Sequence, residues 1–202
     1  MKFICVGRNY AAHALELGNK IPDEPVIFLK PETALLRNNG VFFLPSFTDN
    51  IHYEGELVFR ICKDGKNISE RFASTYIDAV TIGIDFTARD LQNKLKDKGL
   101  PWELSKAFDS SAAIGDFISQ TDAELNNISF HLNMNNNTVQ SSNSANMIFS
   151  PEKLVSFVSK YITLRIGDML FTGTPEGVGA IKKDDEFDGF IGEKKLLSCR
   201  VK

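Results

Sequence analysis

Three acidic residues, Glu54, Glu56 and Asp85, are the first candidates for chemistry in this sequence of 202 residues. Glu54 and Glu56 stand two apart in a run that alternates like a strand, so their side chains project to one face. Asp85 ends an apolar run and is placed to project from a sheet edge. Such a set of carboxylates selects Mg²⁺, Mn²⁺ or Ca²⁺ over zinc or copper. The alternatives are two surface glutamates and an aspartate that caps the following helix.

A second candidate is the pair His13 and Glu16, three residues apart in a segment with helical spacing. Residues at this spacing share one helix face. A carboxylate bonded to one imidazole nitrogen fixes the tautomer and raises the basicity of the other nitrogen, which suits a general base for water. The alternative interpretation is a histidine and a glutamate that lie together on the surface.

Two further features are Lys106 and the glycine-rich segment 173–179. Lys106 lies in the apolar and aromatic run from Trp102 to Asp109, where an ammonium group could stabilise a developing oxyanion. A lysine in such a run can also simply extend its charge to solvent. Segment 173–179 could present backbone N–H groups to a carboxylate, or it could be a tight turn between strands. It lacks the spacing of a phosphate-binding P-loop.

Many short strands and a few short helices must position these residues. Apolar runs predict strands at residues 2–6, 26–30, 41–44, 53–61 and 80–84, and a hairpin at 126–148. Helical spacing predicts helices at 9–17, ending at Gly18, at 69–78 and at 87–98, the last with a capping box from Thr87 to Asp90. Ser150 and Pro151 predict the start of another helix. We expect a mainly β fold of the α+β class, in one domain spanning residues 1–202, because no repeat or linker interrupts the chain.

Composition excludes several function classes. The chain has 23 Lys and Arg against 26 Asp and Glu, a net charge of −3, which argues against a nucleic-acid partner. The lysines of residues 94–98 are interleaved with other types, which indicates a solvated helix face. No apolar run approaches the roughly 20 residues of a membrane span, and the N-terminal run is too short for a signal peptide. Three scattered cysteines without a Cys-x-x-Cys pair favour a reduced, cytoplasmic location.

The order of the motifs along the chain resembles the fumarylacetoacetate hydrolase family. The resemblance covers essentially the whole chain, and it is strongest to the short, single-domain acylpyruvase and oxaloacetate decarboxylase branch. The motifs that carry it are Gly7-Arg8-Asn9-Tyr10 with His13 and Glu16, Phe28-Leu29-Lys30-Pro31, Glu54 with Glu56, Asp85-Phe86-Thr87-Ala88-Arg89-Asp90, Gly99-Leu100-Pro101-Trp102 with Lys106 and Phe108, Met147-Ile148-Phe149, and Gly173-Thr174-Pro175-Glu176-Gly177-Val178-Gly179.

The resemblance implies a fold and a set of residue roles. The fold would be a mixed β-roll with a few short flanking helices, assembled as a homodimer. The metal ligands would be Glu54, Glu56 and Asp85, with Mg²⁺ or Mn²⁺ expected and Ca²⁺ as a further candidate. The catalytic residues would be Lys106 and the dyad of His13 and Glu16, the dyad lying on a mobile lid helix at residues 8–20 with Gly7 and Gly18 as hinges. The substrate-binding residues would be Arg8, Tyr10, Gln92 and Thr174.

The activity implied is metal-dependent cleavage of a C–C bond in a small 2-oxo acid. Hydrolysis of an acylpyruvate and decarboxylation of oxaloacetate would both pass through an enolate of pyruvate, whose charge the metal and Lys106 would stabilise. Two alternatives remain open at this point. The enzyme could be an oxaloacetate keto–enol tautomerase, or an isomerase or hydratase of a related diketo acid. A non-catalytic scaffold that binds a ligand is the alternative from another class.

Overall fold

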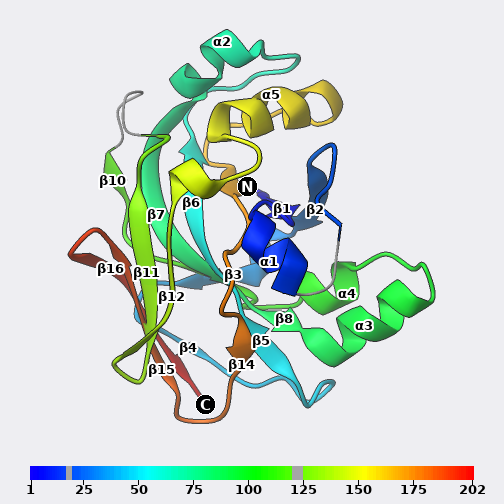
Figure 1. Ribbon diagram of the computed structural model, residues 1–202, viewed down its shortest axis with the longest axis vertical. Helices are drawn as coiled ribbons and strands as arrows, with labels where there is room; N and C mark the ends of the chain where they lie inside the picture. The colour runs from blue at the N-terminus through cyan, green and yellow to red at the C-terminus, as the bar shows by residue number, and fades with distance from the viewer. Residues whose placement is uncertain (17–19, 120–124) are drawn as a thin grey trace.

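The computed structural model describes residues 1–16, 20–119 and 125–202, and within them strands outnumber helices (Figure 1). The α-helices are α1 (Ala11–Glu16), α2 (Glu70–Ala73), α3 (Arg89–Asp97), α4 (Glu103–Lys106) and α5 (Pro151–Tyr161). The 3-10 helices are η1 (Glu32–Ala34), η2 (Ser74–Tyr76) and η4 (Ser144–Asn146). The strands are β1 (Phe3–Gly7), β2 (Val26–Lys30), β3 (Leu35–Arg37), β4 (Gly40–Phe42), β5 (Ile51–Tyr53), β6 (Gly55–Ile61), β7 (Ile77–Asp85), β8 (Thr87–Ala88), β9 (Ala112–Ile114), β10 (Ile118–Ser119), β11 (Ser129–Met134), β12 (Asn137–Asn143), β13 (Met169–Phe171), β14 (Gly179–Ala180), β15 (Glu186–Ile191) and β16 (Lys194–Val201).

The strands form three sheets that curl around a common interior. The largest has the order β2-β1-β13-β6-β7-β9-β3, with β10 also paired to β7. A five-stranded sheet has the order β12-β11-β15-β16-β4, and a small sheet has the order β14-β5-β8. Both parallel and antiparallel pairs occur, as in β1 with β13 and β6 with β7. The prediction of a mainly β fold with mixed strands and few short helices is confirmed.

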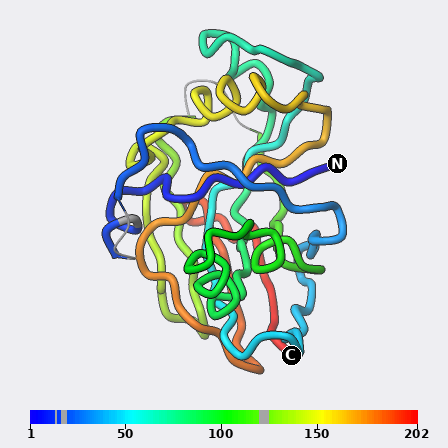
Figure 2. The backbone as a smooth tube through the Cα atoms, turned by 90° about the vertical axis from the view of Figure 1, so that its right-hand side faces the viewer, coloured from blue at the N-terminus to red at the C-terminus, as the bar shows by residue number. Residues whose placement is uncertain are grey.

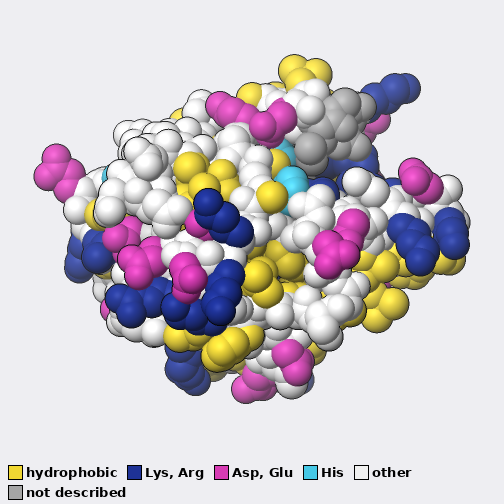
Figure 3. All heavy atoms as spheres, turned by 90° about the horizontal axis from the view of Figure 1, so that it is seen from below, with side chains coloured by type: hydrophobic (Ala, Val, Ile, Leu, Met, Phe, Trp, Pro, Cys, Tyr) yellow, Lys and Arg dark blue, Asp and Glu magenta, His cyan; other side chains and the backbone are white. Residues whose placement is uncertain are grey.

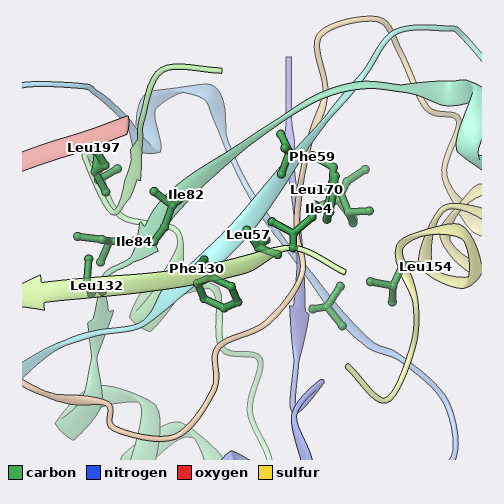
Figure 4. Packing of buried hydrophobic residues seen from close by; sticks show 14 of the residues in the cluster. Ile4, Leu57, Phe59, Ile82, Ile84, Phe130, Leu132, Leu154, Leu170 and Leu197 are labelled. Atoms are coloured by element: carbon green, nitrogen blue, oxygen red, sulfur yellow. The ribbon is translucent and has the colours of Figure 1, made fainter. Parts of the chain in front are cut away.

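The main hydrophobic core lies where the large sheet faces the five-stranded sheet. Figure 4 shows Leu57 of β6 beside Phe130 of β11, and Ile82 of β7 beside Leu197 of β16. The alternation of apolar residues along these strands explains the packing, since every second side chain points inward. In Figures 1 and 2, α5 packs beside α2 at one end of the molecule, and α3 and α4 lie on the opposite side of the strands from the five-stranded sheet.

The predicted strand at 53–61 is wrong at its start. The chain leaves β5 at Tyr53 and enters β6 at Gly55, so Glu54 lies between two strands. The physical reason is that β5 pairs with β14 and β8, whereas β6 pairs with β7 and β13. The chain therefore changes sheets at Glu54, a change that alternation along a sequence does not reveal.

Two predicted helices begin or end elsewhere. The capping box from Thr87 to Asp90 is wrong, because Thr87 belongs to β8 and the helix α3 begins at Arg89 without a side-chain cap. The Thr87 hydroxyl instead accepts a hydrogen bond from Lys106. The predicted helix at 69–78 is limited to α2 and η2, because Ile77 already pairs with Ile61 in the large sheet. The helix predicted at 9–17 is α1, and its predicted end at Gly18 lies outside the described residues.

Other local predictions are confirmed. Asn135 and Asn136 turn the hairpin between β11 and β12 with positive φ angles of 53° and 65°, as expected for residues that tolerate this region. The Ser150 side chain accepts a hydrogen bond from the backbone N–H of Lys153 and caps α5. No helix in the described part of the chain is long and apolar enough to cross a membrane. All three cysteines lie in described segments and are free thiols.

Candidate active site

The carboxylates of Glu54, Glu56 and Asp85 converge at one buried point. One ligand oxygen of each lies within 4.8 Å of the others, and all three side chains are buried. Glu54 joins β5 to β6, Glu56 is the second residue of β6, and Asp85 is the last residue of β7. Because β6 and β7 pair with Glu56 opposite Gly83, the ends of the two strands bring the three acids together.

Three positive groups surround these acids. The Lys106 ammonium donates to Glu54 Oε2 and Asp85 Oδ2, each at 2.8 Å. Lys30 Nζ lies 2.6 Å from Asp85 Oδ1, and Arg89 donates to Glu54 Oε1. Lys106 is therefore buried among carboxylates and does not extend to solvent, so that alternative interpretation is wrong. Asp85 does not cap a helix, because both of its oxygens face lysines.

The peptide between the two glutamates is held by Gln140 of β12 and by Thr174 of the segment between β13 and β14. The Gly55 N–H donates to Gln140 Oε1 at 2.8 Å, and the Thr174 hydroxyl donates to the Gly55 carbonyl at 2.9 Å. Gln140 Nε2 donates in turn to Thr174 Oγ1 at 2.8 Å. A Cβ atom at Gly55 would lie 3.0 Å from Gln140 Oε1, which leaves little room for any other residue. Gln140 and Thr174 thus fix the spacing of Glu54 and Glu56.

The electrostatics of the two glutamates are opposite. Burial acts to raise the pKa of Glu54, but the charges of Lys106 and Arg89 bring it well below its ordinary value. Burial, together with the negative charges of Asp85 and Glu54, raises the pKa of Glu56 well above its ordinary value. The backbone N–H of Gly173, 2.7 Å from Glu56 Oε2, offsets only part of that effect. The site is therefore short of positive charge at Glu56.

These residues fit a divalent cation. Oxygen ligands on one octahedral Mg²⁺ ion lie about 3.0 Å apart when adjacent and about 4.2 Å apart when opposite, for a bond length of about 2.1 Å. The three carboxylate oxygens, within 4.8 Å of one another, would therefore move toward one another on binding an ion. The set consists of hard oxygen donors alone, which suits Mg²⁺, Mn²⁺ or Ca²⁺. A cation would also supply the positive charge that Glu56 lacks. Glu54, Glu56 and Asp85 are the residues that would hold it.

The helix α1 places His13 at the same cavity, with Glu16 beside it. His13 Nδ1 lies 3.2 Å from Glu16 Oε2, and the Gly177 N–H donates to Glu16 Oε1 at 3.2 Å. His13 is buried and lines the cavity that also contains Glu54, Asp85 and Lys106. His13 is therefore not on the open surface, whereas Glu16 is exposed and ties α1 to the glycine-rich segment through Oε1.

The segment before α1 is anchored by Asn9. Its side chain donates to the carbonyls of Phe149 and Thr172 and accepts from the Phe149 N–H. Arg8 next to it has a positive φ angle of 61°, which is uncommon for a residue other than glycine, and lines the cavity. Tyr10 belongs to the hydrophobic core, its ring 6.4 Å from that of Phe130, and is not among the described residues that line the cavity.

The remaining wall of the cavity is formed by α3 and by two aromatic rings. Gln92 accepts a hydrogen bond from Arg89 Nη1 at 2.6 Å, and both residues line the cavity. The rings of Phe28 and Trp102 lie 6.3 Å apart on its other side. Thr174 lines the cavity as well, although its hydroxyl is engaged by Gly55 and Gln140. The free volume is about 40 Å³.

Several residues of the site were not found by sequence reasoning. Lys30 and Arg89 stood only inside motifs, with no role assigned, and they neutralise Asp85 and Glu54. Gln140 lies in the hairpin strand β12, far along the chain from the acids it supports. Neither spacing nor composition marks it, since its role depends on the five-stranded sheet lying beside β6.

Comparisons with known proteins agree on one family. The sequence matches the family model described as "Fumarylacetoacetate (FAA) hydrolase C-terminal" over residues 2–200. It is 40% identical over 200 residues to "Oxaloacetate tautomerase FAHD1, mitochondrial" of Bos taurus, covering 98% of this chain and 90% of that one. It is 41% identical over 183 residues to "Oxaloacetate decarboxylase, mitochondrial" of Dictyostelium discoideum, covering 90% of this chain and 84% of that one.

A solved structure gives the same result at the level of the fold. The crystal structure of fumarylpyruvate hydrolase from Pseudomonas aeruginosa in complex with Mn²⁺ and pyruvate superposes with a TM-score of 0.92 at 39% sequence identity. The match covers 100% of this chain and 89% of that chain. The similarity therefore extends over the entire fold and includes the segments that carry the acids, Lys106 and α1.

Proposed function

Since the chain belongs to the fumarylacetoacetate hydrolase family, as its sequence motifs indicated, we propose that it is a metal-dependent enzyme acting on small 2-oxo acids. The reaction proposed is cleavage of a C–C bond to give pyruvate, by hydrolysis of an acylpyruvate or by decarboxylation of oxaloacetate. The observation that supports this most is the buried convergence of Glu54, Glu56 and Asp85 with the Lys106 ammonium among them.

A divalent cation held by the three carboxylates would supply Lewis-acid polarisation of the carboxylate and keto oxygens of a 2-oxo acid. Lys106 has a complementary role. Although burial acts to lower its pKa, Asp85 and Glu54 raise it above the ordinary value, so its ammonium stays charged. A fixed positive charge in a buried site stabilises negative charge as it develops on the enolate oxygen of the departing pyruvate.

His13 and Glu16 would activate water for the hydrolytic reaction. A proton on His13 Nδ1 that is donated to Glu16 leaves Nε2 free to accept a proton from water. The water oxygen then bonds to the distal carbonyl carbon, and the bond from that carbon to the methylene breaks. The electron pair of that bond stays with the methylene carbon, so the departing fragment is the enolate of pyruvate. The enolate then takes a proton at C3 to give pyruvate. In oxaloacetate the distal group leaves as carbon dioxide, and no water is needed.

A second candidate function is keto–enol tautomerisation of oxaloacetate. The Bos taurus relative carries that name, whereas the Dictyostelium relative is named as a decarboxylase. The same cavity supports it, since tautomerisation requires only that one group remove a proton from C3 and another supply one to oxygen. His13 lines the cavity and can take up and return a proton there, while the charged Lys106 ammonium stabilises the enolate oxygen.

Ultraviolet absorbance of acetylpyruvate and of oxaloacetate tests the proposal. With Mg²⁺ or Mn²⁺ we expect loss of the diketo or enol absorbance, and with a chelator we expect no change. Formation of pyruvate, measured with lactate dehydrogenase, separates cleavage from tautomerisation. If neither compound is converted in the presence of either metal, the proposed function is wrong.

A lid and a cellular location are further proposals for this chain. The helix α1 would act as a lid over the cavity, because it carries His13, which lines the cavity. Its proposed hinge Gly18 lies outside the described residues. A cytoplasmic location also stays a proposal, and the animal and slime-mould relatives are named as mitochondrial proteins.

The chain is also proposed to form a homodimer. Hydrophobic side chains gather on the face shown in Figure 3, and Phe47 and Leu104 are exposed around a hollow that Leu91 and Phe108 also line. Exposed apolar patches commonly mark protein–protein contacts. Light scattering should give twice the chain mass for the native protein and a lower mass for Leu104→Glu, and a monomeric native protein would contradict the proposal.

A further inference from the structure

The cavity has a second group of charges, opposite in sign to the carboxylates. Arg8, Arg89, Lys96 and Lys106 all line it. Arg89 and Lys106 are occupied by ion pairs with Glu54 and Asp85. Arg8 and Lys96 have no carboxylate partner within the part of the chain that the structure describes. They are therefore available to bind a group that is not part of the protein.

Lys96 is placed in the cavity by the geometry of α3. It lies four residues after Gln92, so both side chains are on the helix face that is turned toward the site. Its ammonium lies 5.3 Å from the ring centre of Trp102, which forms the adjacent wall. Lys94 and Lys98, by contrast, are exposed. The prediction that residues 94–98 form a solvated helix face is thus wrong for Lys96, because that residue faces inward.

The charge around the cavity is unbalanced in favour of an anion. Lys30, Lys106 and Arg89 form ion pairs with Asp85 and Glu54, and together they equal the three carboxylates in number. The side chains of Arg8 and Lys96 therefore add positive charge that no ion pair among the described residues compensates. Burial, and then the positive charges of Arg89, Arg8 and Lys106, lowers the pKa of Lys96 to about 8. An ammonium group among other cations in a half-buried place gains strongly from a carboxylate partner.

We propose that Lys96, with Arg8 beside it, determines substrate specificity by binding the distal carboxylate of a 2-oxo acid that carries two carboxylates. The inference rests on the proposed function, in which the 2-oxo acid end of the substrate lies at Glu54, Glu56 and Asp85. The proximal carboxylate is then at the acids, and the second negative charge faces α3. A 2-oxo acid with an apolar distal end would leave Lys96 without a partner.

The experiment compares two four-carbon acids that differ only at the distal end. Oxaloacetate carries a carboxylate there, and 2-oxobutyrate carries a methyl group. The variant Lys96→Met removes the charge and keeps the aliphatic chain against Trp102, Lys96→Arg keeps the charge, and Lys94→Met is the matched control on the exposed face of α3. The readouts are KM for oxaloacetate and the inhibition constant for 2-oxobutyrate, both with Mg²⁺.

We expect Lys96→Met to raise KM for oxaloacetate about tenfold or more. This is the loss of affinity expected when one hydrogen bond to a charged group is removed. The inhibition constant for 2-oxobutyrate should stay within about twofold in all variants, and Lys96→Arg should recover most of the oxaloacetate affinity. Equal changes for both acids, or no change for either, would overturn the proposal. So would an equal effect of Lys94→Met.

A direct binding measurement keeps the inference separate from the proposed function. Trp102 is the single tryptophan of the chain, so its fluorescence reports on ligands beside Lys96. If the protein converts no 2-oxo acid, the proposed function fails, yet oxaloacetate should still change this fluorescence at a lower concentration than 2-oxobutyrate. That preference should disappear in Lys96→Met. Equal affinities of the native protein for the two acids would overturn the inference.

Discussion

Replacement of Glu56 by Gln should have opposite effects on the metal-free and the metal-loaded protein. In the metal-free protein an oxygen of Glu56 lies within 4.8 Å of an oxygen of Glu54 and of Asp85. At an effective dielectric constant of about 20, each such like-charge pair costs about 3–4 kcal/mol, which Lys106 offsets in part. Glutamine keeps the shape and can still accept the Gly173 N–H. We therefore expect metal-free Glu56→Gln to be about 1–3 kcal/mol more stable at neutral pH.

The pH dependence of this difference has a definite sign. The folded-state pKa of Glu56 is raised well above its ordinary value of 4.5, first by burial and then by Asp85 and Glu54. A group whose pKa is raised in the folded state makes its full contribution to the free energy of unfolding below its unfolded-state pKa. That contribution is lost as the pH rises through its folded-state pKa. The advantage of glutamine should therefore be absent near pH 4 and grow as the pH rises above about 5.

Magnesium should reverse the order of the two proteins. A ligand that binds only the folded state stabilises it by about 4.1 kcal/mol at one thousand times its dissociation constant. The native protein should gain this amount, and Glu56→Gln, which lacks one of the three carboxylates, should gain far less. Urea unfolding with and without Mg²⁺ measures both effects, and Glu193→Gln at an exposed turn is the control. An equal gain for Glu56→Gln would refute the assignment of Glu56 as a ligand.

Three other predictions concern the groups around the acids. Gln140→Leu leaves the buried Gly55 N–H without an acceptor and should cost about 2–4 kcal/mol in urea unfolding; a cost below about 1 kcal/mol would contradict the role given to it. His13→Ala should slow acylpyruvate hydrolysis about a hundredfold or more while decarboxylation of oxaloacetate changes little, and equal losses would mean that His13 does not activate water. KM for oxaloacetate should rise as the pH passes about 8, where Lys96 loses its charge, and Lys96→Arg should show no such rise because arginine stays protonated.

Much of the fold could be anticipated because its signals are local. The hairpin turn at Asn135 and Asn136 and the start of α5 at Ser150 each depend on a few neighbouring residues. The break between β5 and β6 at Glu54 could not be anticipated, since it arises from strands far away in the sequence. The same is true of Thr87, whose hydroxyl is bound by Lys106 and does not cap α3.

The acids, His13, Glu16 and Lys106 were found because motif order along the chain identifies them. Their partners were not, because the roles of Lys30, Arg89 and Gln140 exist only in three dimensions. Lys96 shows the limit most clearly. In the sequence it is one of three similar lysines, and only the rotation of α3 separates it from its two exposed neighbours.

The position of Glu54 between β5 and β6 has a mechanical consequence. The three-stranded sheet that contains β5 is joined to the large sheet at this residue, and the carboxylate lies at the joint. An ion shared by Glu54 and by Asp85 at the end of β7 would clamp the two sheets together. Lys106 already links Glu54, Asp85 and Thr87 of β8, so an ion would tighten this joint further. Removal of the ion should raise amide hydrogen exchange first in the backbone around β5, β8 and β14.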